Sequence, residues 1–196
     1  MTGYPRQLGD AEIRSALRTH LEQRWASCPG TVLIEELGLC RGQVRVDLAV
    51  VNGTLHGYEI KSDRDRLHRL PSQVEVYGRV MDRATVVVGG KHLGDVVRIL
   101  PPWWGVLRAF GTGGRVSIEP VRPSQPNPGR APRALAELLW RDQALALLET
   151  RQAADGVRSK PRPVIWDRLC EVFDVGEIAE AVRGQLKSRA EDSVRA

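Results

Sequence analysis

The chain has 196 residues, which is enough for one sizeable core or for a core domain with a small appendage. Its formal net charge of +5 favours a polyanionic partner such as nucleic acid. Three cysteines without a CxxC pair give no sign of a disulfide framework or a zinc knuckle. The N-terminus lacks the apolar segment of a signal peptide, and no window approaches the ~18 apolar residues of a membrane span. Composition therefore predicts a cytoplasmic protein that makes no membrane contact.

The first part of the chain predicts one helix and three strands. Residues 10–25 carry apolar side chains at fourfold spacing, which is typical of a helix. Residues 31–39 favour a strand, and residues 43–51 alternate apolar and polar side chains, as a half-buried strand does. Asn52-Gly53 is a turn signal, so we expect residues 54–61 to form the second arm of a hairpin.

A second group of elements follows. Residues 72–82, opened by Pro71, predict a helix, and residues 84–88 a short buried strand. Residues 91–100 then predict a helix and residues 103–110 a strand. The order αβββαβ, then αβ, predicts a mixed sheet with helices on its faces, in the α/β class.

Composition changes after this core. Residues 117–132 contain five prolines between polar turns, which indicates a linker. Residues 133–196 read as strongly helical segments with a basic break. We therefore expect a core domain over residues 1–116, a proline-rich linker over 117–132, and a small C-terminal helical domain over 133–196.

The hairpin decides whether three charged side chains, Asp47, Glu59 and Lys61, share one face of the sheet. Glu59 and Lys61 do so by strand alternation. A two-residue loop at Asn52-Gly53 would turn Asp47 to the other face, because directly opposed residues share a face. A three-residue loop would set Asp47 diagonal to or directly across from Glu59. We predict the three-residue form.

Two carboxylates close together on a strand pair repel, so the pattern predicts a cation between Asp47 and Glu59. Mg²⁺ or Mn²⁺ suits such a site, since carboxylates, water and substrate phosphate complete its ligand shell. Lys61 would stabilise charge that develops on a phosphoryl group. Gln73 would hydrogen bond the same water or phosphate, with Tyr77 one helical turn further on the same side. These residue types predict phosphodiester hydrolysis.

The same residues carry a resemblance to a known family. Asp47, Glu59-Ile60-Lys61 and the Gln73-x-x-x-Tyr77 arrangement look like the motif of the PD-(D/E)xK nuclease superfamily, with its αβββαβ core. The segment EELGLCRGQVRVDLAVVNGTLHGYEIKSDRDRLHRLPSQVEVY, followed by VVGGKHL and RSKPRP, resembles the bacterial sce7726 family, whose biological role is unestablished. The resemblance covers nearly the whole chain and implies a restriction-endonuclease-like core.

Carried over by position, the resemblance implies that Asp47 and Glu59 bind the metal and that Lys61 is the catalytic lysine. Gln73 would assist from its helix, and the carbonyl of Ile60 would be a further metal ligand. Superfamily members often add a glutamate from the first helix. The candidates here are Glu22, Glu12 and, from a strand, Glu36.

Basic side chains flank the carboxylates and are expected to contact phosphates. The competing interpretation is that Asp63 and Asp65 neutralise this loop and leave an ordinary charged turn. A second basic segment, residues 158–162, is expected to contact phosphate or a partner. The expected nucleic-acid-binding residues are Arg41, Arg45, Arg64, Arg66, Arg69, Tyr77, Arg158, Lys160 and Arg162.

Together these patterns predict an Mg²⁺-dependent nuclease that hydrolyses phosphodiester bonds, with DNA as the expected partner. The C-terminal helices are candidates for binding a protein partner, and the oligomeric state stays open. Two alternatives use the same residues differently. One is a non-catalytic nucleic-acid-binding or adaptor protein, and the other is a phage or bacterial effector that targets a protein with a nuclease scaffold.

Overall fold

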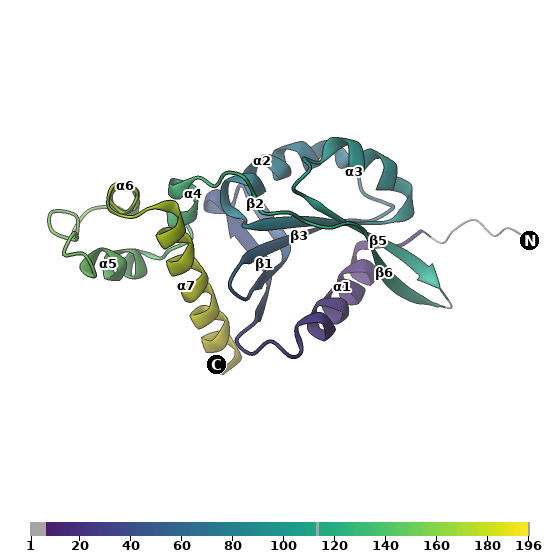
Figure 1. Cartoon of the computed structure of the whole chain (residues 1–196), viewed down its shortest axis with the longest axis horizontal. Helices are drawn as coiled ribbons and strands as arrows, with labels where there is room; N and C mark the ends of the chain where they lie inside the picture. The colour runs from purple at the N-terminus through teal and green to yellow at the C-terminus, as the bar shows by residue number, and fades with distance from the viewer. Residues whose placement is uncertain (1–6, 113, 196) are drawn as a thin grey trace, which may run out of the picture.

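The computed structural model describes residues 7–112 and 114–195, and a six-stranded sheet with helices on both faces forms its centre (Figure 1). The spatial order of the strands follows the chain: β1 (Val32–Leu39), β2 (Val44–Val51), β3 (Leu55–Lys61), β4 (Arg83–Val88), β5 (Gly105–Thr112) and β6 (Arg115–Arg122). Strands β1 to β3 pair antiparallel, β3 to β5 parallel, and β6 antiparallel to β5, so the expected mixed α/β sheet is confirmed.

The helices confirm the expected αβββαβ element order. They are α1 (Asp10–Trp25), α2 (Leu70–Val80), α3 (Leu93–Ile99), α4 (Pro132–Ala136), α5 (Arg141–Glu149), α6 (Arg162–Val172) and α7 (Val175–Arg195). Within the described residues, every helix is too short or too polar to cross a bilayer.

Helix α1 covers one face of the sheet. The fourfold apolar spacing of its sequence places Ile13, Leu17 and Leu21 on one side, and all three are fully buried. They pack in one cluster with side chains of the strands, including Leu48 and Tyr58. Alternation along the strands therefore decides which residues face α1.

Helix α2 packs on the opposite face, over strands β3 and β4. Its apolar stripe buries Val76, Tyr77 and Val80 against strand residues of the larger core cluster. Gly57 of β3 lies directly beneath this helix, since a Cβ at that position would meet the Tyr77 ring at 2.8 Å and the Met81 sulfur at 3.1 Å. The lack of a side chain at Gly57 thus lets α2 approach the sheet closely.

The sixth strand corrects the expected domain boundary. The predicted linker was to begin at Ser117, but Ser117 pairs with Phe110 inside the β5–β6 ladder. The prolines of this segment suggested a linker, yet Pro120 is tolerated because β6 is the edge of the sheet, where a missing N–H breaks no further ladder. The predicted start of the linker at Ser117 is therefore wrong. Residues 123–131 alone connect β6 to α4.

The C-terminal helices share a core with the sheet. Buried side chains of α4 to α7 belong to the same apolar cluster as β2, β4 and α2. Asp82 strengthens this connection, because its carboxylate accepts the backbone amide of Leu55 at 2.7 Å, a hydrogen bond from Arg130, and one from Arg183 of α7 at 3.1 Å. The predicted helical segment after residue 133 is present, and it packs against the sheet as part of one body.

Gly57→Ala is expected to lower the free energy of unfolding by about 1–3 kcal/mol, because the added methyl group overpacks the contact with Tyr77 and Met81. Urea unfolding monitored by circular dichroism measures this change. Gly38→Ala in β1 is the matched control, since a Cβ there meets nothing within 4 Å. Equal stability of the two variants would contradict the close approach of α2.

Candidate functional site

The candidate site is built on the antiparallel pair β2–β3. Val51 pairs with Leu55, so residues 52–54 form the predicted three-residue loop. Continuing the same register sets Asp47 of β2 directly across from Glu59 of β3. The predicted gathering of charged side chains on one face of the sheet is therefore confirmed.

The carboxylate of Glu59 accepts three hydrogen bonds from side chains. Lys61 donates from Nζ to Oε1 at 2.6 Å, and Gln73 donates from Nε2 to the same oxygen at 2.5 Å. The Tyr77 hydroxyl donates to Oε2 at 2.7 Å. Glu59 is 2% exposed and Lys61 5% exposed, so the two form a buried ion pair. Buried charges of this kind need both a charged partner and further hydrogen bonds.

The carboxylate of Asp47 is held from two sides. Arg14 of α1 donates from Nη2 to Oδ1 at 2.7 Å, and the backbone amide of Ile60 donates to Oδ2 at 2.7 Å. Sequence reasoning missed Arg14, because a charged residue on the flank of a helix does not reveal which strand it reaches. Ile60 takes part through its amide, and the proposed use of its carbonyl as a metal ligand stays a prediction.

Of the candidate additional acids, Glu36 lies at the site and Glu22 does not. The carboxylate of Glu36 is 3.0 Å from Arg14 and 3.4 Å from Arg45. Its backbone φ of 57° is unusual for a side chain of this size in a strand. Glu22 instead pairs with Arg18 at 2.9 Å on the exposed surface of α1.

A polar cavity of 270 Å³ opens beside the carboxylates. One of its lining atoms, Oε1 of Gln73, is buried and has no donor among the described residues. The walls carry charges of both signs, so the cavity is not a purely anionic cleft. Its charged lining residues are Asp10, Glu36, Arg45, Asp47, Glu59, Lys61, Asp65 and Arg69.

Burial controls the protonation of these groups. Burial raises the pKa of Glu59 above its ordinary value, and Lys61 only partly offsets this effect. Burial also raises the pKa of Asp47, against the lowering caused by the Ile60 amide and by Arg14. Burial and the adjacent Glu59 carboxylate raise the pKa of Tyr77 well above its usual range, so its hydroxyl stays a proton donor.

A divalent ion was predicted in order to relieve repulsion between the two carboxylates. Here protein cations relieve it, since Arg14 contacts Asp47 and Lys61 contacts Glu59. Among the residues that the structure describes, no three His, Cys, Asp or Glu side chains gather as a group suited to hold a metal ion. Binding of Mg²⁺ or Mn²⁺ at Asp47 and Glu59 stays a prediction.

The loop between β3 and α2 turns its acids inward. Asp63 accepts the backbone amides of Leu8 at 2.9 Å and Lys91 at 3.0 Å. Asp65 accepts the amide and the hydroxyl of Ser62, both at 2.7 Å. The basic side chains of the loop are exposed, and within the described parts of the chain they have no carboxylate partner. These exposed residues are Arg64, Arg66, His68 and Arg69.

The other predicted nucleic-acid contacts lie in different surroundings. Tyr77 is fully buried between α2 and the sheet, so its predicted contact with nucleic acid is wrong. Arg158 pairs with Glu149 and Asp155 and has little free donor capacity. The remaining predicted contacts, Arg41, Lys160 and Arg162, are exposed, and Arg45 is exposed beside Glu36.

Comparison with known proteins gives one family match. A family model described as Bacteriophage P4 protein cII matches residues 6–195. Protein cII of Enterobacteria phage P4 is 33% identical over 100 residues, which cover 51% of this chain and 38% of that protein. The aligned part of the chain thus spans well under two thirds of this relative.

Among solved structures, a protein of unknown function from Silicibacter pomeroyi, SPO1766, is similar to the chain. Its TM-score is 0.40 and its sequence identity 21%, over 82% of this chain and 98% of that one. A likeness this weak carries no argument about function.

The family match corrects two expectations. The resemblance to the sce7726 family and to the PD-(D/E)xK superfamily is wrong, because the family model that spans the chain is that of protein cII. The nuclease function that followed from it is wrong for the same reason. The alternative of a non-catalytic nucleic-acid-binding or adaptor protein fits the comparisons better.

Glu59→Gln is expected to change how stability depends on pH. A carboxyl whose pKa is raised by folding binds a proton more readily in the folded chain, so its contribution to stability falls as the pH rises from the unfolded pKa through the folded one. Replacing the carboxyl group by an amide removes this pH-dependent loss of stability. Urea unfolding between about pH 4 and about pH 7 should therefore show a flatter decline in the free energy of unfolding than in the unsubstituted chain.

Glu75→Gln provides the control for this pH series, because Glu75 lies exposed on the same helix, α2. It should follow the pH dependence of the unsubstituted chain. If Glu59→Gln did so too, the pKa of Glu59 would not be raised by folding.

Proposed function

The chain belongs to the family of bacteriophage P4 protein cII, and from this premise we propose that it is a non-catalytic nucleic-acid-binding protein whose partner is DNA. The proposal rests on one observation, the exposed arginines of the loop from Ser62 to Arg69. The proposal includes a restriction-endonuclease-like core, which the element order αβββαβ supports. This part concerns the fold alone, and the core would serve as a scaffold for binding.

The loop is built so that its positive charge faces solvent. Asp63 and Asp65 are occupied by backbone amides and by Ser62, which leaves Arg64, Arg66 and Arg69 without a carboxylate partner among the described residues. A guanidinium without a carboxylate partner has its N–H donors available. It can bind a phosphate group through two parallel hydrogen bonds. The loop therefore suits the DNA backbone rather than base edges.

Other exposed arginines are already paired within the chain. Arg18 contacts Glu22, Arg98 contacts Asp95, and Arg151 contacts Glu177. A phosphate would have to displace these carboxylates, so a DNA contact at such a position would contribute less binding free energy. The contrast between paired and unpaired arginines supports the loop as the contact surface.

The buried pair of Glu59 and Lys61 helps to fix the position of the loop. Lys61 is the last residue of β3, and its carbonyl accepts the amide of Gly89 at 3.1 Å, directly before the loop begins. Gln73 and Tyr77 fix the helix at the other end of the loop to the same Glu59 carboxylate. On this proposal the charged network is a positioning device for the loop.

Replacing Arg64, Arg66 and Arg69 together by Ala is expected to weaken binding of duplex DNA and to lower the slope of log affinity against log salt by about 1 for every phosphate that is no longer bound. Fluorescence anisotropy with a labelled duplex over a salt series measures both quantities. The matched control replaces Arg18, Arg98 and Arg151 by Ala, which removes the same formal charge from paired, exposed positions. Equal weakening in the two triple variants, or no DNA binding at low salt by the unsubstituted chain, would contradict the proposal.

Gly89→Ala is expected to weaken DNA binding without touching any arginine. A Cβ at Gly89 would lie 2.6 Å from Cγ of Asp63, so the carboxylate that shapes the loop must move. Gly90→Ala is the control, because a Cβ there meets nothing within 4 Å. Unchanged affinity in a folded Gly89→Ala variant would show that the loop conformation does not matter for binding.

A further inference from the structure

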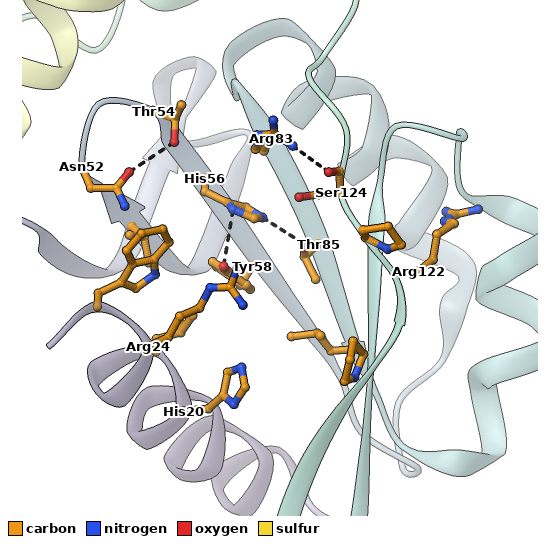
Figure 2. A pocket seen from close by; sticks show the side chains of 16 residues that line it. His20, Arg24, Asn52, Thr54, His56, Tyr58, Arg83, Thr85, Arg122 and Ser124 are labelled. Carbon is orange, nitrogen blue, oxygen red and sulfur yellow. Dashed lines mark hydrogen bonds between the residues drawn. The ribbon is translucent and has the colours of Figure 1, made fainter. Parts of the chain in front are cut away.

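A second pocket lies on the opposite face of the sheet from Glu59, apart from the arginine loop. It has a volume of 320 Å³ and opens between the end of α1, the start of β3 and β4, and the end of β6. Figure 2 shows His20 and Arg24 reaching from α1 toward His56 and Tyr58 on the strand. Pockets of about 300 Å³ and more are large enough for a small organic ligand.

The lining of this pocket is basic. Its residues include Arg24, Arg83 and Arg122, and none of the described residues that line it is Asp or Glu. The Arg83 guanidinium donates to the Ser124 carbonyl at 2.6 Å (Figure 2) and has no carboxylate partner among the described residues. Arg122 donates to the carbonyls of Trp104 and Pro101 instead and points away from the centre of the pocket. Arg24 and Arg83 therefore set its positive potential.

The histidine in the floor of the pocket is neutral. Burial lowers the pKa of His56 to about 3, and the charges of Arg83 and Arg24 act in the same direction. Its Nε2 lies 2.8 Å from the Thr85 hydroxyl, and its ring stacks on Tyr58 with centroids 4.3 Å apart. The floor thus offers polar groups and flat aromatic surface together.

Trp25 forms part of the pocket wall beside Arg24. Its buried Nε1 has no acceptor among the residues that the structure describes. Arg24 lies over the Trp25 ring, 5.5 Å from its centroid. The Trp25 ring therefore holds the guanidinium of Arg24 at the wall of the pocket through a cation–π contact.

We propose that this pocket binds a phosphorylated ligand with a planar ring, of the size of a nucleoside monophosphate. Arg24 and Arg83 hold the phosphate, because guanidinium groups bind phosphate oxygens with charge-assisted hydrogen bonds. The ring lies against the aromatic surface of His56 and Tyr58 in the floor, as bases do on aromatic side chains. The same chemistry occurs in a free nucleotide and at the 5′-phosphorylated end of a nucleic-acid strand, and the experiment separates these two sources.

Isothermal titration calorimetry of the full chain with AMP, adenosine and inorganic phosphate tests the pocket. AMP should bind, adenosine should bind far more weakly, and Arg24→Ala should weaken AMP binding by about tenfold or more, the effect of losing charge-assisted hydrogen bonds. Arg24 is exposed, so this variant should fold, and Arg18→Ala on the same helix should bind AMP normally.

A second titration compares a short single-stranded oligonucleotide carrying a 5′-phosphate with the same oligonucleotide carrying a 5′-hydroxyl. Preference for the phosphorylated form that Arg24→Ala abolishes, and that the triple loop variant keeps, would identify a strand end as the ligand. AMP binding without that preference would identify a free nucleotide. The proposal is overturned if neither probe binds at millimolar concentration, or if Arg24→Ala and Arg18→Ala bind equally well.

Discussion

The buried carboxylate of Glu59 is the group on which the arrangement of the site depends. A charge with only 2% exposure is stable only when its surroundings supply opposite charge and donors, and Lys61, Gln73 and Tyr77 supply them from a strand and a helix. These bonds hold α2 at a fixed position over β3, where Gly57 leaves room for the Tyr77 ring. The loop that joins strand and helix is therefore fixed at both ends, and its arginines face solvent.

The sequence predicted the parts of the site that follow from periodicity. Strand alternation put Glu59 and Lys61 on one face, and helical spacing put Gln73 and Tyr77 on one side of α2. It could not reveal Arg14, which reaches Asp47 across a sequence separation that no local pattern records. It also assigned most of β6 to a linker, because the prolines of an edge strand resemble those of a linker.

The functional interpretation failed for a related physical reason. Two carboxylates, a lysine and a glutamine on a strand pair and its following helix indicate a metal-dependent hydrolytic site. The same residue types also form a network of ion pairs and hydrogen bonds, and here Arg14 contacts Asp47 and Lys61 contacts Glu59. Sequence gives the identity and spacing of such groups, whereas the partner of each carboxylate depends on tertiary packing. The sequence left open whether Asp63 and Asp65 neutralise the basic loop. Only the structure shows that both acids turn inward instead.

Asp82 has a consequence for how the molecule opens. One carboxylate joins the start of β3, the segment before α4, and the middle of α7, three regions far apart in the chain. The Asp82 side chain is only 14% exposed with α7 in place. If α7 moved away, the carboxylate would lose a cationic partner, and apolar side chains of the shared cluster would meet water. Partial opening at this end of the molecule is therefore unfavourable, and we expect the sheet and the C-terminal helices to unfold together.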